Sequence, residues 1–348
     1  MCRLGWGCAF AWIFESRAPR YVCDISGASC ISTVTGGTGK CSRYLWSKDC
    51  AFEAVRLLGL VLDMISIVAL ATCHNRFEKT LNAVANMSVW LDSLQADTRI
   101  VIVDDGSTDG TGNAIRRRFP GVEVIDGNGS LFWAGGMRHG WDHAIVANPP
   151  DYLIVFNDDV VLDPTGMTLA LESFLTLADP AEPCLMTAAC RDVAQGAVTY
   201  GGLLRSCWWH PLRFEVVQPT GKVQAVDTCN MNFAILSRGA LESIGFLDPC
   251  YIHVRADFDY GLRLRAAGGQ VWLAPESVGG CSRNEATGSS SDHKLPLTQR
   301  WRQLLSIKEH HPGQRALYYR RHGGVLWPLY WALPYISFWL RGGRSRPS

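Results

Sequence analysis

Several runs of β-branched and apolar residues in the middle of the chain end abruptly at paired acidic side chains. One run, Ile-Val-Ile-Val, stops at Asp104 and Asp105, and another, Tyr-Leu-Ile-Val-Phe, stops just before Asp158 and Asp159. Unbroken apolar runs of this length predict parallel strands that are buried on both faces of a sheet. Ligands of open α/β sheets bind outside the carboxyl ends of the strands, so we expect the four carboxylates to line one cleft. Such a cluster suits a cation or a sugar.

The residues that follow each acidic pair indicate different ligands. After Asp105 the chain reads Gly-Ser-Thr-Asp, a tight turn rich in residues that favour the start of a helix. This turn favours a nucleoside pocket, in which a carboxylate accepts hydrogen bonds from a base or a ribose. Asp158 and Asp159 precede a short extended segment, so we expect their carboxylates at the sheet edge beside solvent, as hard ligands for Mg²⁺ or Mn²⁺. The alternative, that both pairs only form turns and helix caps, is less expected for two pairs at strand ends.

A third acidic segment, residues 255–268, has helical periodicity. Phe258 and Leu262 fall on one stripe, and a glycine ends the pattern. Asp257 and Asp259 lie in the predicted first turn of this helix. Acidic side chains at this position can simply complement the helix dipole, which is the alternative to a role in chemistry.

Taken in order, these segments resemble the inverting glycosyltransferases of family 2, which have the GT-A fold. Residues 64–76 are similar to that family's first strand and nucleotide-binding turn, and residues 103–109 are similar to its second. Residues 157–159 match the position of its Asp-x-Asp metal motif, with Asn in the first place, and residues 127–138 resemble its glycine-rich loop. The resemblance covers residues 64–282. It implies an α/β fold with a single mixed, mostly parallel sheet flanked by helices and followed by a C-terminal helical tail.

The resemblance also implies roles for individual residues. Asp159 would hold the metal, Asp257 would be the general base, and Asp259 would contact the acceptor, although Ala256 replaces the Glu of the family's Glu-Asp motif. The cofactor would be Mg²⁺ or Mn²⁺. The residues expected to bind the donor are Thr72, Asn75, Arg76, Asp104, Asp105, Trp133, Gly135, Gly136, Arg138 and Asp158.

Three tryptophans are candidates for stacking on a sugar. Trp133 is the best placed because it lies in the glycine-rich segment, ahead of Trp208 and Trp209. Aromatic side chains mostly supply packing area, which is the alternative for all three.

The predicted reaction moves a hexosyl or deoxyhexosyl group from a nucleoside-diphosphate donor to a glycan or lipid-linked acceptor, as in bacterial relatives that build cell-surface polysaccharides. A cation at Asp159 would stabilise the leaving group, and Asp257 would take the acceptor's proton on the opposite face of the sugar. Two alternatives remain. A sugar nucleotidyltransferase should carry a basic glycine-rich loop, which residues 71–76 do not form. A non-catalytic nucleotide-sugar-binding protein would not need Asp159 or Asp257.

Composition agrees with one enzyme domain and two appendages. The 348 residues are 47% hydrophobic, enough for a large α/β core, and the net charge of +1 without a basic block argues against a nucleic-acid partner. We expect a glycosyltransferase domain over residues 64–295, with a nucleotide-sugar half at 64–185 and an acceptor half at 186–295. Residues 1–63 hold six of the 13 cysteines with little periodicity. We expect them to be a largely unstructured extension, placed upstream of the true start by a misassigned start codon, and a disulfide-linked knot is the alternative.

The C-terminal tail, residues 296–348, contains an apolar and aromatic stretch at 325–340. It is interrupted by Pro328 and Pro334 and is shorter than the roughly 20 residues that a membrane span requires. Trp, Tyr and flanking Arg residues favour a segment lying on an anionic membrane, and packing on its own domain is an equal alternative. We therefore expect a cytoplasmic enzyme, peripheral at the inner face of the plasma membrane.

Overall fold

The computed structural model describes residues 65–146, 149–282 and 286–340, together with four short strands within the first 64 residues. The chain divides into two compact units, residues 1–64 and 65–348. In the first unit the four strands pair antiparallel in sequence order. They are β1 (Ala9–Ala11), β2 (Tyr21–Asp24), β3 (Ile31–Val34) and β4 (Tyr44–Leu45). Most of residues 1–63 lie outside the described part, so the expected unstructured extension stays a prediction.

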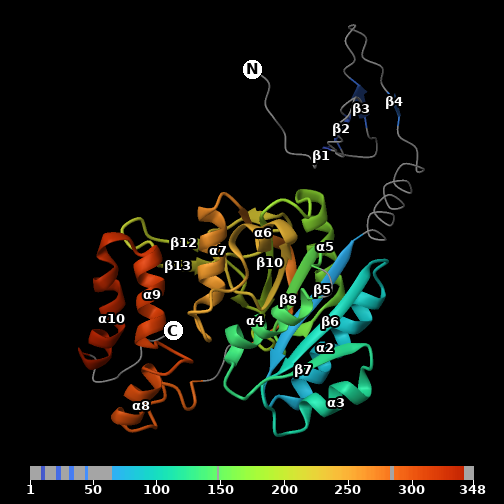
Figure 1. Cartoon of the computed structure of the whole chain (residues 1–348). Helices are drawn as coiled ribbons and strands as arrows, with labels where there is room; N and C mark the ends of the chain where they lie inside the picture. Colours follow the sequence, from blue (N-terminus) through green and yellow to red (C-terminus); the bar gives the residue numbers. More distant parts are fainter. Residues whose placement is uncertain are drawn as a thin grey trace. The chain divides into compact units, whose positions relative to one another are not determined.

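The second unit is built on a ten-stranded mixed sheet (Figure 1). Its strands are β5 (Ser66–Cys73), β6 (Asp97–Asp104), β7 (Val122–Asp126), β8 (Tyr152–Phe156), β9 (Val161–Leu162), β10 (Cys184–Arg191), β11 (Val198–Tyr200), β14 (Gln224–Ala225), β16 (Phe233–Ser237) and β17 (Gln270–Gly280). The main order is β14-β17-β10-β16-β8-β5-β6-β7, with β11 beside β10 and β9 beside β17. Strands β7, β6, β5 and β8 are mutually parallel, β16 runs against β8 and β10, and β10 is parallel to β17. Six of the ten strands therefore point the same way, which confirms the predicted sheet.

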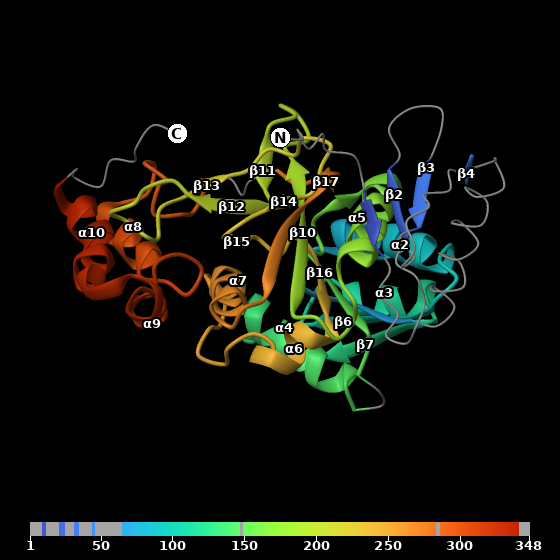
Figure 2. The same cartoon turned by 90° about the horizontal axis from the view of Figure 1, so that it is seen from above.

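Helices cover both faces of this sheet, as Figure 2 shows. They are α2 (Phe77–Asp92), α3 (Thr111–Arg118), α4 (Phe132–Ala144), α5 (Pro164–Leu177), α6 (Arg238–Ile244) and α7 (Ala256–Ala266). Helix α4 packs on β5 and β6, and α5 packs on β17. All five residues of β8 are buried, as its unbroken apolar sequence predicts for a central strand covered on both sides.

A smaller sheet stands beside the main one and carries a hairpin. Its strands are β12 (Gly202–Arg205), β13 (Phe214–Val216) and β15 (Thr228–Cys229). They are antiparallel in the order β13-β12-β15, and residues 206–213 connect β12 to β13. Helix α7 packs against β15, and the ring of Phe214 lies 5.9 Å from that of Phe258. The hairpin base is thus fixed to the helix that carries Asp257.

The chain ends in a helical tail, as predicted. Its elements are α8 (Leu297–Leu304), α9 (Pro312–His322), the short 3₁₀ helix η1 (Gly324–Leu326) and α10 (Trp327–Leu340). Pro334 lies inside α10, so this proline does not interrupt the helix as the sequence suggested. None of the described helices combines the length and apolar character needed to cross a membrane.

Candidate active site

Asp158 lies two residues past the end of β8 and is fixed by Arg76 and Thr80 at the start of α2. Arg76 Nη1 lies 2.7 Å from Asp158 Oδ1, and the Thr80 hydroxyl donates to Oδ2 at 3.2 Å. Burial raises the pKa of the Asp158 carboxyl, and the charge of Arg76 opposes this rise. The expectation that both carboxylates of this pair lie beside solvent is wrong for Asp158, because the side chains of α2 close over it.

Asp159 is the more accessible member of the pair. Its Oδ2 lies 3.1 Å from Arg76 Nη1, whereas its Oδ1 faces only the weakly donating thiol of Cys281, at 3.8 Å. Burial and the neighbouring carboxylate raise the pKa of Cys281 to about 12, so the thiol stays protonated. Asp159 Oδ1 is therefore a hard oxygen without a strong donor.

A divalent cation fits Asp159 as one ligand among several. No group of three His, Cys, Asp or Glu side chains that could hold a metal occurs in the described part of the chain. Mg²⁺ and similar ions commonly bind through one or two carboxylates and complete their shell with water and substrate phosphates. The donor set around Asp159 suits that mode and does not suit a metal held by protein ligands alone.

Asp104 and Asp105 organise the loops on the donor side of the sheet. Asp104 accepts backbone N–H groups of Ser107 and Gly112 at 3.0 and 3.1 Å, which closes the turn after β6 and the start of α3. Asp105 accepts three backbone N–H groups from residues 129–132, at 2.8 to 3.2 Å. Both carboxylates are buried. Their predicted contact with a nucleoside stays a prediction. In the structure both carboxylates stabilise the backbone of the loops that follow β6 and β7.

The segment expected to be a glycine-rich loop is partly helical. Helix α4 begins at Phe132, so Trp133, Gly135, Gly136 and Arg138 all lie within it. A Cβ at Gly136 would fall 2.9 Å from Thr72 Cβ at the end of β5, and closer still to the Thr72 hydroxyl. Glycine at 136 thus lets the helix approach the strand.

Arg138 and Trp133 point from α4 toward two different parts of the site. Arg138 Nη1 donates to the backbone oxygens of Tyr251 at 2.7 Å and Asp248 at 3.2 Å. Arg138 therefore ties α4 to the loop before α7, and its predicted contact with the donor stays a prediction. Trp133 Nε1 donates to Asn157 Oδ1 at 2.9 Å, which places the indole at the end of β8 beside the acidic pair.

Asn75 connects the turns after β5 and β6. It adopts a left-handed backbone conformation with φ of 52°. Its N–H donates to Ser107 Oγ at 2.9 Å, and its Oδ1 accepts the Thr108 N–H at 2.7 Å. The two turns that the sequence assigns to the nucleotide are therefore held together as one unit.

Asp257 occupies the first turn of α7 and is half-buried. Its Oδ1 accepts the Phe258 N–H at 2.9 Å, and its Oδ2 lies 3.4 Å from Asn230 Nδ2. Burial raises the pKa of the Asp257 carboxyl, although these hydrogen bonds and the charge of Arg255 oppose the rise. A partly accessible carboxylate with an elevated pKa is well suited to accept a proton.

Residues 230–232, which no sequence motif singles out, lie between the two acidic positions. Asn230 contacts Asp257, while the backbone oxygen of Asn232 accepts the backbone N–H of Asn157 at 3.0 Å. The Asn232 side chain also lies 3.7 Å from the thiol of Cys281, next to Asp159. The available signal was the pair of polar residues directly before the buried run of β16, which mirrors the acids that follow β6 and β8.

Asp259 does not face this site. Its carboxylate is fully buried, and Arg263 Nε, Arg321 Nη1 and His322 Nε2 lie 2.7 to 2.8 Å from its oxygens. The hydroxyl of Tyr251 adds a hydrogen bond of 3.2 Å. We therefore correct the predicted acceptor contact at Asp259, because a carboxylate enclosed by four side chains cannot reach a substrate.

The comparison with known families agrees with this arrangement. The sequence model of glycosyl transferase family 2 matches residues 69–242, half of the chain. The chain belongs to this family. The matched segment includes Asp104, Asp105, Asp158 and Asp159, whereas Asp257 lies beyond it. No curated protein matches the sequence.

Two solved structures illustrate what this glycosyltransferase family 2 chain is similar to. GalNAc-T7 with UDP, GalNAc and Mn²⁺ is 12% identical with a TM-score of 0.46, over 61% of this chain and 42% of that one. The mannosyltransferase PcManGT from Pyrobaculum calidifontis, in complex with GDP-Man and Mn²⁺, is 14% identical with a TM-score of 0.44, over 68% of this chain and 67% of that one. The present chain thus spans less than half the length of the first.

Proposed function

We propose that the protein is an inverting, metal-dependent glycosyltransferase that uses a nucleoside-diphosphate sugar. One observation carries this proposal. Asp159 has a hard oxygen without a strong donor, and Asp257 is a half-buried carboxylate with a raised pKa. Segment 230–232 lies between them, because Asn230 contacts Asp257 and Asn232 contacts the Cys281 thiol, which in turn contacts Asp159. Transfer from a nucleotide sugar needs both kinds of group, one at the leaving diphosphate and one at the acceptor hydroxyl. Family membership supports the same class of reaction.

Each residue would act at a defined atom. A divalent cation, Mg²⁺ or Mn²⁺, bound at Asp159 would neutralise charge that develops on the diphosphate. Arg76 would add positive charge on the same side, since its guanidinium lies between Asp158 and Asp159. Asp257 would accept the proton of the acceptor hydroxyl as its oxygen bonds to the anomeric carbon and the bond to the diphosphate breaks. Attack from the face opposite the leaving group inverts the anomeric centre.

The donor side would be formed by the turns after β5 and β6 and by the start of α4. Asn75 and Asp105 hold these turns in place, and Trp133 presents an indole beside the acidic pair. The proposed substrate is a hexosyl or deoxyhexosyl nucleotide, with a glycan or lipid-linked acceptor. We place the reaction in polysaccharide synthesis at the cytoplasmic side of the membrane, in keeping with the aromatic and basic C-terminal tail.

A panel of nucleotide sugars tests the proposal. The full chain is incubated with each donor and Mn²⁺, and release of the nucleoside diphosphate is measured with and without a chelator. We expect release from one donor or a small set, and loss of that release on chelation. With a glycan acceptor added, proton NMR of the glycosidic product should show the anomeric configuration opposite to that of the donor. Retention of configuration, or activity that chelation does not change, would contradict the proposed chemistry.

A further inference from the structure

Helix α10 has an apolar side that no described residue covers. Leu326, just before it, and Leu329, Leu333, Ile336 and Leu340 recur at intervals of three or four residues, so they form one stripe. Each is at least 42% exposed. The rest of the helix packs inward, with Tyr330 and Phe338 buried. A helix that is apolar on all sides is normally enclosed by protein or lipid, and extended exposed apolar surface marks an interaction site.

A second exposed apolar element lies against the same helix. Trp208 and Trp209, in the loop between β12 and β13, are 95% and 54% exposed. The Tyr330 hydroxyl donates to the backbone oxygen of Trp209 at 2.6 Å, and the rings of His210 and Tyr330 lie 4.1 Å apart. Tyr330 follows Leu326 by about one helical turn, so the hairpin meets the helix at the border of the leucine stripe. Two segments more than one hundred residues apart in sequence therefore adjoin.

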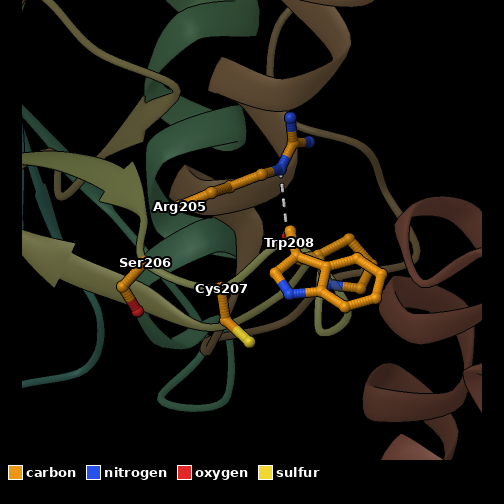
Figure 3. Close-up of a pocket in the computed structure, with 5 residues that line it drawn as sticks. Arg205, Ser206, Cys207 and Trp208 are labelled. Carbon is orange, nitrogen blue, oxygen red and sulfur yellow. Dashed lines mark hydrogen bonds between the residues drawn. The ribbon is translucent and has the colours of Figure 1, made fainter.

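The tip of the hairpin has the composition of a membrane-interface element. Figure 3 shows Trp208 and Arg205 at an open hollow that is also lined by Ser206, Cys207 and Pro211. Arg205 Nε donates to the Pro211 oxygen at 3.0 Å, which holds the loop in shape. The indole of Trp208 is almost fully exposed, so its insertion into the headgroup region costs little free energy. Tryptophan is enriched in that region of the bilayer.

Exposed arginines accompany both parts of this surface, Arg205 and Arg213 beside the tryptophans and Arg320 on α9. Residues 310–348 contain no Asp or Glu, but they contain six arginines. A surface that joins leucine, tryptophan and arginine is complementary to an anionic bilayer.

We propose that the hairpin tip, Trp208 and Trp209, and the leucine stripe of α10 form one surface that binds the headgroup region of an anionic membrane. The proposal extends membrane contact to a segment outside the tail. It concerns binding rather than turnover, so it can fail or succeed separately from the proposed chemistry.

Co-sedimentation of the full chain with vesicles tests this surface. One set of vesicles contains phosphatidylcholine alone, and another contains about one third phosphatidylglycerol. Two double variants are compared with the unchanged protein: Trp208→Ser with Trp209→Ser, and Leu329→Gln with Leu333→Gln. The matched control replaces two apolar residues of similar exposure elsewhere, Val89→Gln with Val193→Gln, which are 68% and 70% exposed. Circular dichroism melting shows whether each variant remains folded.

We expect the unchanged protein and the control to bind the anionic vesicles, and to bind neutral vesicles more weakly. Each double variant should lose about tenfold or more in affinity, since a large apolar side chain gains about that much from burial. Equal binding by the tryptophan variant would remove the hairpin from the surface and overturn the proposal. The stripe is a subunit interface, and the proposal is overturned, if the unchanged protein binds neither kind of vesicle and forms a dimer in gel filtration that the leucine variant dissociates. If the tryptophan variant binds vesicles normally but loses affinity for a soluble glycan, the hairpin is a sugar-binding site, which also contradicts the proposal.

Discussion

Asp259 and Arg321 are 62 residues apart in the sequence, yet Arg321 Nη1 lies 2.8 Å from Asp259 Oδ1. This ion pair fixes α9 to α7, the helix whose first turn holds Asp257. Arg263 and His322 complete the enclosure of the carboxylate. The C-terminal tail is thus anchored directly to the element that carries the proposed base.

Replacing Asp259 should therefore destabilise the protein rather than alter donor binding. Asp259→Ala leaves buried cationic groups without their partner, and we expect the free energy of unfolding to fall by about 3–5 kcal/mol. Urea denaturation followed by circular dichroism measures this change. Asp126→Ala is the matched control, because Asp126 also pairs with an arginine but is 74% exposed and should lose at most about 1 kcal/mol. Equal losses in the two variants would contradict the anchoring role.

The contribution of Asp259 should also depend on pH. Burial alone would raise the pKa of its carboxyl, but the hydrogen bonds from His322 and Arg263 outweigh burial and hold that pKa below its usual range. A depressed folded-state pKa means that the stabilisation is complete above the unfolded value, about 3.9, and is lost as the pH falls through the folded value. The stability difference between the unchanged protein and Asp259→Ala should accordingly be constant near neutral pH and shrink on acidification below about pH 4.

The close approach of α4 to β5 gives a prediction with a built-in control. Gly136→Ala places a Cβ 2.9 Å from Thr72 Cβ, so the helix must shift, and we expect a loss of about 1–3 kcal/mol in unfolding free energy. Gly135→Ala meets its nearest neighbour, Leu131 Cβ, at 3.4 Å, an ordinary contact. This neighbouring change should be neutral or stabilise the helix by up to about 1 kcal/mol. Thermal unfolding measures the stability of both variants. If Gly136→Ala leaves stability unchanged, the helix can shift freely and the prediction is contradicted.

Asp257 should make the fold less stable at neutral pH, because its pKa is raised by burial. A raised folded-state pKa stabilises the protein below the unfolded value and loses that effect as the pH rises through the folded value. Asp257→Asn removes the buried charge, so its unfolding free energy at pH 7 should exceed that of the unchanged protein. Asp92→Asn, an exposed carboxylate at the end of α2, should leave stability unchanged. Lower stability of Asp257→Asn would mean that the carboxylate is better solvated than the structure indicates.

Asp159 should govern the metal-dependent part of donor binding. In Asp159→Ala the Oδ1 atom that we assign to the cation is absent, so calorimetry should show no gain in affinity for the donor or its diphosphate product when Mn²⁺ is added. The exposed Asp142→Ala variant should keep that gain. An undiminished Mn²⁺ effect in Asp159→Ala would move the metal to another ligand.

The parts that the sequence predicted well depend on local patterns. The apolar runs before Asp104 and Asp158 read directly as buried strands, and the helical period of residues 255–268 correctly located α7. The burial of Asp259 could not be read in this way, because its partners Arg321 and His322 come from a helix packed on it in three dimensions. A local acidic pattern does not distinguish a carboxylate facing a cleft from one facing a distant arginine.

Two other differences have a similar origin. The glycines at 135 and 136 suggested a loop, but glycine also permits close helix packing, and the contact with Thr72 decides between the two. Asn230 and Asn232 belong to the site because β16, which follows them, lies between β8 and β10. No local pattern in the sequence indicates that position. The order of strands in the sheet, rather than any single motif, therefore assembles the acidic positions.

The turnover of the Asp257→Asn variant tests the central claim most directly. Asparagine keeps the size and most hydrogen bonding of the side chain but cannot accept the proton. With the donor identified by the panel, an acceptor and Mn²⁺, we predict a fall in kcat of about 10² or more, with donor affinity nearly unchanged. A variant that transfers sugar at close to the normal rate would show that Asp257 is not the general base.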